Sequence, residues 1–203
     1  MAAMEKRRAI VAITGASGVT IGIRVAKALA DAEAEVFCVV SDAAAKIIPQ
    51  EIENADDAKS ALQNLCQKNE YGKIEKIKFF DERDFYAPPA SGSFRFDAMA
   101  IAPCSMKTLG KLANGIADNL IVRAAEVALK ERRRIVVVPR ETPLALTHIR
   151  NMETLALAGA VILPPVISFY NKPESAADMA DIIAARIVQA MGFKQTTVKE
   201  WGM

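Results

Sequence analysis

The chain has 203 residues, 52% of them hydrophobic, which predicts one compact domain over residues 1–203 with its core at about 8–193. A formal net charge of +2 gives no reason to expect general binding to nucleic acid or to a membrane surface. Three cysteines without a C-x-x-C pair suit a reducing compartment, and no signal peptide is evident, so we expect a cytoplasmic protein.

The first distinctive unit is IVAITGASGVTIGIRVAKA at residues 10–28, an apolar run followed by three glycines and then by helical periodicity. It predicts a strand, a tight turn and a helix whose first N–H groups face any phosphate bound there. Thr14 and Ser17 add hydroxyl donors at the same turn. A plain strand-to-helix turn also fits. A dinucleotide site, with Asp42 on a ribose, is a weaker alternative because the glycine spacing differs from G-x-G-x-x-G.

The next segments read as a buried strand at 35–41, helices at 42–51 and 56–68, and a short strand at 74–80. Ser41 ends the first of these strands at the edge where ligands usually bind. Residues 86–94, YAPPASGSF, form a loop, because two prolines and a glycine oppose a regular element.

A buried strand at 97–102 leads into the turn PCSMKT at residues 103–108. Ser105 is placed to cap the helix that follows, so this turn also offers N–H groups to an anion. Cys104 is a candidate nucleophile at that helix terminus. No base lies near it in the sequence, and a small apolar residue packed at the strand end is the better interpretation.

Residues 119–131 predict a long helix on which Arg123 and Lys130, seven positions apart, share one face. The strand 135–138 then ends at Arg140 and Glu141, which places a guanidinium and a carboxylate at the carboxyl edge of the sheet.

The last third predicts a helix with Pro143 in its first turn, a strand at 161–163 and a helix at 175–191. His148 is the single histidine and has no Cys or His partner at ligand spacing, so we expect no metal site.

Six strands alternating with helices predict a three-layer α/β/α Rossmann-like (flavodoxin-like) domain with a six-stranded parallel sheet of order 3-2-1-4-5-6. The gap between strands one and four brings the two N–H-rich turns to one crevice. A phosphate-bearing cofactor is the expected ligand.

Seven motifs in order resemble the UbiX-type flavin prenyltransferases from about residue 10 to the last helix: GASGVTIGIR, APPASGSF, PCSMKTL, NLIVRAAEVALKERR, PRETPL, NMETLALAGAVILPP and FYNKP. The resemblance implies transfer of the dimethylallyl group of dimethylallyl phosphate to N5 and C6 of reduced FMN, without metal, in a homododecamer. It also implies that the product, prenylated FMN, serves UbiD-type decarboxylases, as in ubiquinone biosynthesis. The sequence leaves a diphosphate donor open.

The resemblance also implies residue roles. The FMN contacts are Gly15, Ala16, Ser17, Ser41, Ser105, Met106, Lys107, Thr108 and Arg140. The prenyl donor is bound by Arg123, Lys130, Tyr170 and Arg186, with Phe85 and Ser91 at its pocket. The residues closest to the chemistry are Glu51, Glu141, Lys130 and Ser17.

These residue types suit the reaction, because a cage of cations with a phenol holds a departing phosphate while carboxylates move protons. Many relatives have an aromatic residue such as Trp where this chain has Phe85, and often Tyr where it has Ile21, which leaves the pocket shape open. Two other functions fit the same fold: an FMN-dependent cysteine decarboxylase, and a non-catalytic flavin carrier for an aromatic-acid decarboxylase.

Overall fold

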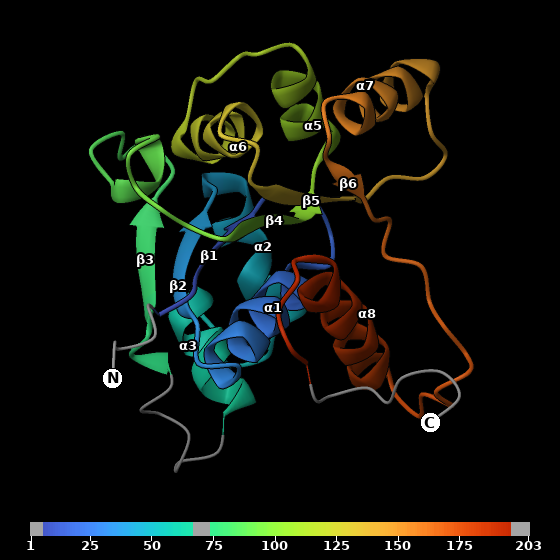
Figure 1. Ribbon diagram of the computed structural model, residues 1–203. Coiled ribbons are helices and arrows are strands. Elements are labelled where there is room, and N and C mark those ends of the chain that lie inside the picture. The colour runs from blue at the N-terminus through green and yellow to red at the C-terminus, as the bar shows by residue number, and fades with distance from the viewer. Residues whose placement is uncertain (1–5, 67–73, 196–203) are drawn as a thin grey trace.

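The computed structural model describes residues 6–66 and 74–195, which form a sheet covered by helices on both faces (Figure 1). Strands and helices alternate along most of the chain, as the sequence predicts. The strands are β1 (Arg8–Ile13), β2 (Glu35–Val40), β3 (Ile77–Asp81), β4 (Ala98–Cys104), β5 (Arg134–Pro139) and β6 (Val161–Ile162). The helices are α1 (Val19–Asp31), α2 (Asp42–Glu51), α3 (Ala58–Leu65), α5 (Met106–Ala113), α6 (Leu120–Lys130), α7 (Leu146–Leu157) and α8 (Ala176–Ala190), with a 3₁₀ turn η2 (Pro88–Ala90).

The sheet is parallel throughout and its order is β3-β2-β1-β4-β5-β6, which confirms the predicted topology. The order reverses between β1 and β4, the first of which pairs with both β2 and β4. Parallel pairing brings the carboxyl ends of β2, β1, β4 and β5 to one edge. In open α/β sheets ligands bind at that edge, beside the point of reversal.

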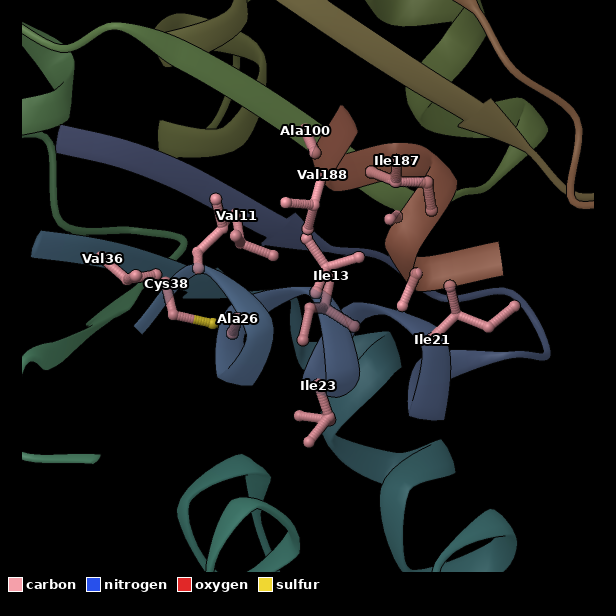
Figure 2. Close-up of a cluster of buried hydrophobic side chains, with 14 of the residues drawn as sticks. Val11, Ile13, Ile21, Ile23, Ala26, Val36, Cys38, Ala100, Ile187 and Val188 are labelled. Atoms are coloured by element: carbon pink, nitrogen blue, oxygen red, sulfur yellow. The ribbon is translucent and has the colours of Figure 1, made fainter. Parts of the chain in front are cut away.

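Strands β1, β2, β4 and β5 are buried on both faces, and alternate residues of β1 serve two separate cores. Val11 and Ile13 face the layer of α1, α3 and α8, where Figure 2 shows them packed with Val36 and Cys38 of β2. Ile10 and the next alternate residue face the layer of α5, α6 and α7. Burial on both faces explains the near-continuous apolar runs that identify these strands in the sequence.

Helix α1 lies very close to the sheet. A Cβ built on Gly22 would lie 2.1 Å from the carbonyl oxygen of Ala102 in β4 and 2.9 Å from Cγ1 of Ile13. Only a residue without a side chain allows this close approach of α1 to β1 and β4.

The predicted bounds are wrong at four elements. Helix α3 begins at Ala58 rather than at residue 56, because the Asp57 side chain caps it by accepting the Ser60 N–H at 2.7 Å. It ends at Leu65, and the last two residues of the predicted helix, 67–68, lie outside the described residues. Pairing with β2 starts only at Ile77, so β3 is shorter than predicted. Strand β4 runs on to Cys104, beyond the predicted 97–102. Pro143 precedes α7 rather than lying in its first turn.

Two smaller predictions also change. The loop at residues 86–94 contains one 3₁₀ turn, because Pro88 and Pro89 have the backbone angles that such a turn needs. His148 has a local structural role, since its Nδ1 accepts the N–H of Ala145 at 3.2 Å at the start of α7.

Candidate functional site

The carboxyl ends of the four central strands are joined side by side by main-chain hydrogen bonds. Each bond links the first residue beyond one strand to the end of its neighbour, so the turns that follow the strands start from one continuous edge. The N–H of Ser41 donates to the carbonyl of Ile13 at 3.0 Å, that of Thr14 to the carbonyl of Pro103 at 3.2 Å, and that of Arg140 to the carbonyl of Cys104 at 3.1 Å. The turns predicted to bind a phosphate-bearing ligand therefore lie together, as expected.

Thr14 holds two of these turns together with its side chain. Its hydroxyl donates to the carbonyl of Pro103 at 2.8 Å and accepts the N–H of Ser105 at 2.8 Å. The residue is only 1% exposed. The predicted role of this hydroxyl as a donor toward a ligand is wrong, because its proton is already committed to a main-chain carbonyl.

The first turn is shaped by two glycines. A Cβ on Gly15 would lie 2.4 Å from the Cβ of Ala43, so this turn packs directly on α2. Gly18 has φ +97, which favours glycine, and it stands at the N-cap of α1. Its N–H donates to both carboxylate oxygens of Glu51, at 2.8 and 3.0 Å. The structure thus places Glu51, predicted near the reacting atoms, at the same turn as Ser17.

The second turn begins α5. Ser105 caps this helix, accepting the N–H of Thr108 at 3.3 Å, and the two hydroxyl oxygens lie 3.1 Å apart. Met106 and Lys107 form the first turn, whose N–H groups have no carbonyl partner within the helix. The N-terminal end of the dipole adds to the attraction for an anion.

Two further turns complete this edge. Ser41 is 7% exposed and caps α2, accepting the N–H of Ala44 at 3.1 Å. Arg140 and Glu141 are exposed beyond β5, and the Glu141 carboxylate accepts the N–H of Thr142 at 3.0 Å. Hydroxyls, N–H groups, a guanidinium and a carboxylate therefore face solvent at one edge.

Cys104 is not a nucleophile in this arrangement. It is fully buried, and burial raises the pKa of its thiol well above the ordinary value. The packing role predicted for it is confirmed. Within residues 6–66 and 74–195, no group of three or more His, Cys, Asp and Glu side chains is placed to hold a metal ion.

Comparison with known proteins identifies the family. A family model described as Flavoprotein matches residues 2–191. The chain is 44% identical over 197 residues to the flavin prenyltransferase UbiX of Archaeoglobus fulgidus, covering 96% of this chain and 100% of that protein. The chain belongs to the UbiX family of flavin prenyltransferases.

Solved structures of UbiX proteins have the same fold. The crystal structure of AnUbiX (PadA1) in complex with FMN and dimethylallyl pyrophosphate matches with a TM-score of 0.85 at 39% identity, covering 98% of this chain and 99% of that one. The dodecameric FMN-dependent UbiX-like decarboxylase from Escherichia coli O157:H7 matches with a TM-score of 0.80 at 35% identity, covering 93% and 96%.

A second group of residues predicted for the UbiX site lies along α6, away from the turns described above. Arg123 donates through Nε to the carbonyl of Ala90 at 3.0 Å. Lys130, in the last turn of α6, pairs with Glu131. The loop that carries Ser91 covers the same end of the helix, since a Cβ on Gly92 would lie 2.8 Å from the Lys130 ammonium nitrogen.

The direction of α6 separates Lys130 from the turns at the carboxyl edge of its own chain. The helix begins at the carboxyl edge, where the N–H of Leu120 donates to the carbonyl of Glu82 just beyond β3. It ends shortly before β5 starts at Arg134, at the opposite edge. Eleven helical residues span about 16 Å, so Lys130 lies far from the turn at Ser105.

The remaining residues predicted to bind the donor are exposed. Tyr170 is 77% exposed in the segment after β6, and Phe85 is 46% exposed after β3. Arg186 lies on the exposed side of α8 and pairs with Gln189. One chain therefore brings the predicted FMN contacts to one edge of the sheet, while Lys130 lies at the opposite edge.

The sequence analysis missed Glu82. Its carboxylate accepts the N–H of Asp42 at 2.7 Å and the side-chain amide of Asn119 at 2.6 Å, so it connects the first residues of α2 and α6. The sequence signal that could have identified Glu82 is its position as a charged residue directly after strand β3. The Asp42 carboxylate pairs with Arg83. The dinucleotide alternative requires this carboxylate to bind a ribose, but in the structure it is engaged by the protein.

Large apolar side chains are exposed on α7, β6 and the segment around them. They are Leu144, Leu146, Ile149, Leu157, Val161, Val166, Ile167, Phe169 and Tyr170, each more than 40% exposed. We call this set the α7–β6 face. In the part of the chain that is described, no helix has the length and apolar character needed to span a bilayer.

Proposed function

We propose that this flavin prenyltransferase binds FMN at the carboxyl edge and transfers the dimethylallyl group of a phosphorylated donor to N5 and C6 of the reduced flavin. The observation that supports this most strongly is the row of turns joined by main-chain bonds. It gathers the residues predicted to contact FMN: Gly15, Ala16, Ser17, Ser41, Ser105, Met106, Lys107, Thr108 and Arg140.

The fit to a phosphorylated flavin follows from the donors present. The first-turn N–H groups of α5 and the guanidinium of Arg140 suit an anion, while the Ser105 and Ser41 hydroxyls suit a polyol chain. Reduced FMN supplies the nucleophilic ring atoms. The protein has to hold that ring, keep water from the allylic group and bind the departing phosphate.

The donor site is proposed to form between subunits. Lys130 and Arg123 of one subunit, and Tyr170 and Arg186 of another, would complete the site of a third. The reason is that Lys130 lies at the opposite edge of its own sheet, while Tyr170 and Arg186 are exposed. The α7–β6 face supports this proposal, since large apolar side chains left exposed in number are typical of protein–protein contact surfaces. A homododecamer is the proposed assembly, by analogy with the dodecameric relative from Escherichia coli.

Two carboxylates are proposed to move protons. Glu51 accepts the Gly18 N–H beside Ser17, and Glu141 stands exposed at the end of β5. Both are therefore within the edge that binds the flavin. General acid–base assistance contributes on the order of a hundredfold to ten-thousandfold, so we expect Glu141→Gln to slow turnover by about a hundredfold without abolishing it. Equal rates for Glu141→Gln and the unaltered protein at every pH tested would remove Glu141 from this role.

The primary test is anaerobic. Purified apoprotein is mixed with reduced FMN and either dimethylallyl phosphate or dimethylallyl diphosphate, without added metal. The mass of the extracted flavin is then measured by mass spectrometry. We expect a gain of one isoprenyl unit. Lys59→Ala, on an exposed lysine of α3, is the matched control and should keep that activity. Unchanged FMN that stays bound would favour a flavin carrier, and flavin reduced by a cysteine substrate would favour a cysteine decarboxylase.

A second test addresses the shared site. Lys130→Ala and Arg140→Ala are each expected to lose turnover. When the two variants are co-expressed and mix at random in one assembly, about a quarter of the sites should be active. Each active site takes Arg140 from a Lys130→Ala subunit and Lys130 from an Arg140→Ala subunit. A site contained within one chain would regain nothing.

The product is proposed to serve a UbiD-type decarboxylase in the cytoplasm. The expected result is that apo-decarboxylase gains activity when mixed with the completed prenyl-transfer reaction. A reaction lacking the prenyl donor is the control.

A further inference from the structure

We infer that Thr14 is a positioning residue for flavin binding, acting through its hydroxyl group on Ser105. The inference rests on the proposed function, because the turns that Thr14 joins are those proposed to hold FMN. Thr14 touches no substrate in this account. It fixes the separation of the two turns that do.

The hydroxyl is fully used within the protein. It donates a hydrogen bond to the Pro103 carbonyl and accepts one from the Ser105 N–H, both at 2.8 Å. A hydroxyl has one proton to donate, so no donor is left for a ligand. With 1% of its surface exposed, Thr14 lies beneath the crevice rather than in its wall.

Ser105 is the more sensitive of its two partners. The Pro103 carbonyl also accepts the main-chain N–H of Thr14, at 3.2 Å, and keeps that bond when the hydroxyl is removed. The Ser105 N–H has the Thr14 hydroxyl as its acceptor. Its own Oγ caps α5 by accepting from Thr108. Thr14 thus fixes the residue that sets the start of α5 and the direction of its first N–H groups.

The same bond determines where the first turn stands. Thr14 is followed directly by Gly15, Ala16 and Ser17, so a shift of the threonine moves the first turn and the second turn together or apart. A ligand that spans both turns binds best at one separation. Substituting valine keeps the shape of the side chain but leaves the Ser105 N–H without an acceptor, which costs more than a bond exchanged with water.

The test compares Thr14→Val, Thr14→Ser and the unaltered protein. FMN affinity is measured by titration, and kcat and KM for the prenyl donor are measured at saturating FMN. We expect Thr14→Val to raise the Kd for FMN about tenfold, and Thr14→Ser, which restores the hydroxyl, to stay within about twofold of the unaltered protein. The donor KM should change little, because its proposed contacts are on other elements.

A matched control separates positioning from stability. Val36→Ala removes two buried methyl groups of β2, in the core on one face of the sheet, and is expected to lower stability at least as much as Thr14→Val. It should leave the Kd for FMN unchanged. If Thr14→Val does not fold, Thr14→Cys, with a weakly bonding thiol of similar size, takes its place in the same comparison.

The outcomes are distinct. A Kd for Thr14→Val or Thr14→Cys equal to that of the unaltered protein overturns the inference, as does a weakened Kd that serine fails to restore. Failure of the proposed function looks different: the unaltered protein binds FMN but forms no prenylated flavin, while the ranking of the Thr14 variants in FMN affinity still stands.

Discussion

The two edges of the sheet use charged side chains in opposite ways. At the amino edge the charges pair with each other: Glu35 accepts from Arg8 at 2.9 Å and from Lys78 at 2.6 Å, and Arg7 lies 3.6 Å from Asp97. At the carboxyl edge Thr14, Ser41 and Ser105 join the central turns through hydroxyls and main-chain groups. Glu51 and Glu82 each accept a main-chain N–H there, and Asp42 pairs with Arg83. Within the described residues, Arg140 has no ion partner there, and Glu141 bonds only the adjacent N–H.

The difference shows which charges serve the fold and which are available to a ligand. Paired charges neutralise each other and hold the strand ends, so they attract a passing anion weakly. An uncharged frame, such as the one around Thr14 and Ser41, keeps the turns in place without using a guanidinium to do so. Arg140 is therefore free to bind a phosphate that the pairs at the other edge would not attract.

Exchanging arginine for alanine at each edge tests this contrast most strongly. We expect Arg140→Ala to lower kcat/KM by about a hundredfold to a thousandfold, the cost of removing one preorganised donor, with the unfolding free energy changed by less than about 0.5 kcal/mol. Arg8→Ala should leave turnover intact and cost about 0.5 kcal/mol of stability, the value of a partly exposed pair.

Steady-state kinetics and urea unfolding on both variants give the four numbers required. Loss of stability without loss of activity in Arg140→Ala would reverse the roles assigned to the two edges. Loss of turnover in Arg8→Ala would show that the amino edge contributes to the site.

The glycine that brings α1 close to β1 and β4 gives the next largest effect. A methyl group on Gly22 meets the Ala102 carbonyl at 2.1 Å, so Gly22→Ala should cost about 2 to 3 kcal/mol through overpacking. Gly110→Ala is the control, because its new Cβ meets only Asn151 Nδ2 at an ordinary 3.5 Å and helix propensity favours alanine by up to about 1 kcal/mol. We expect the urea midpoint to fall in Gly22→Ala and not in Gly110→Ala. If both midpoints shift in the same direction, the close approach of α1 to the sheet is contradicted.

The fold was largely predictable because its signals are local. Apolar runs bounded by glycine and proline identify the strands, and the alternation of strands with helices fixes a parallel sheet. Errors occurred where neighbours decide the bounds: β3 begins where β2 can pair with it at Ile77, and α3 begins where Asp57 caps it. Neither pairing nor capping geometry is visible in hydrophobic periodicity.

The candidate site was predictable in part. Turns that directly follow strands, such as those at Ser41 and Ser105, take their place from the topology alone. The role of the Thr14 hydroxyl was misread, because its partners Pro103 and Ser105 are 89 and 91 positions away in the chain. Lys130 and Tyr170 were assigned a role by resemblance alone, and the proposed site would take these two residues from neighbouring subunits.

The smallest effect concerns the pH dependence of the amino edge. Hydrogen bonding to Lys78, aided by Arg8, holds the pKa of Glu35 below its ordinary 4.5. A lowered pKa in the folded state stabilises the protein above the unfolded pKa, and this contribution disappears as pH falls through the folded value. Glu35→Gln should therefore be less stable than the unaltered protein by about 1 kcal/mol at pH 7, with the difference fading below about pH 4.5.

Urea unfolding at a series of pH values measures this difference, with Glu53→Gln, an exposed carboxylate after α2, as the control that should show little at any pH. Because the Glu35 pairs are partly open to solvent, added salt should shrink the difference at pH 7 as well. Among the residues that the structure describes, Arg140 has no ion partner, so the stability of Arg140→Ala relative to the unaltered protein should not depend on pH or salt in this range. A pH-independent deficit in Glu35→Gln would mean that Glu35 stabilises β2 by packing rather than by charge, and the contrast between the two edges would then rest on Arg140 alone.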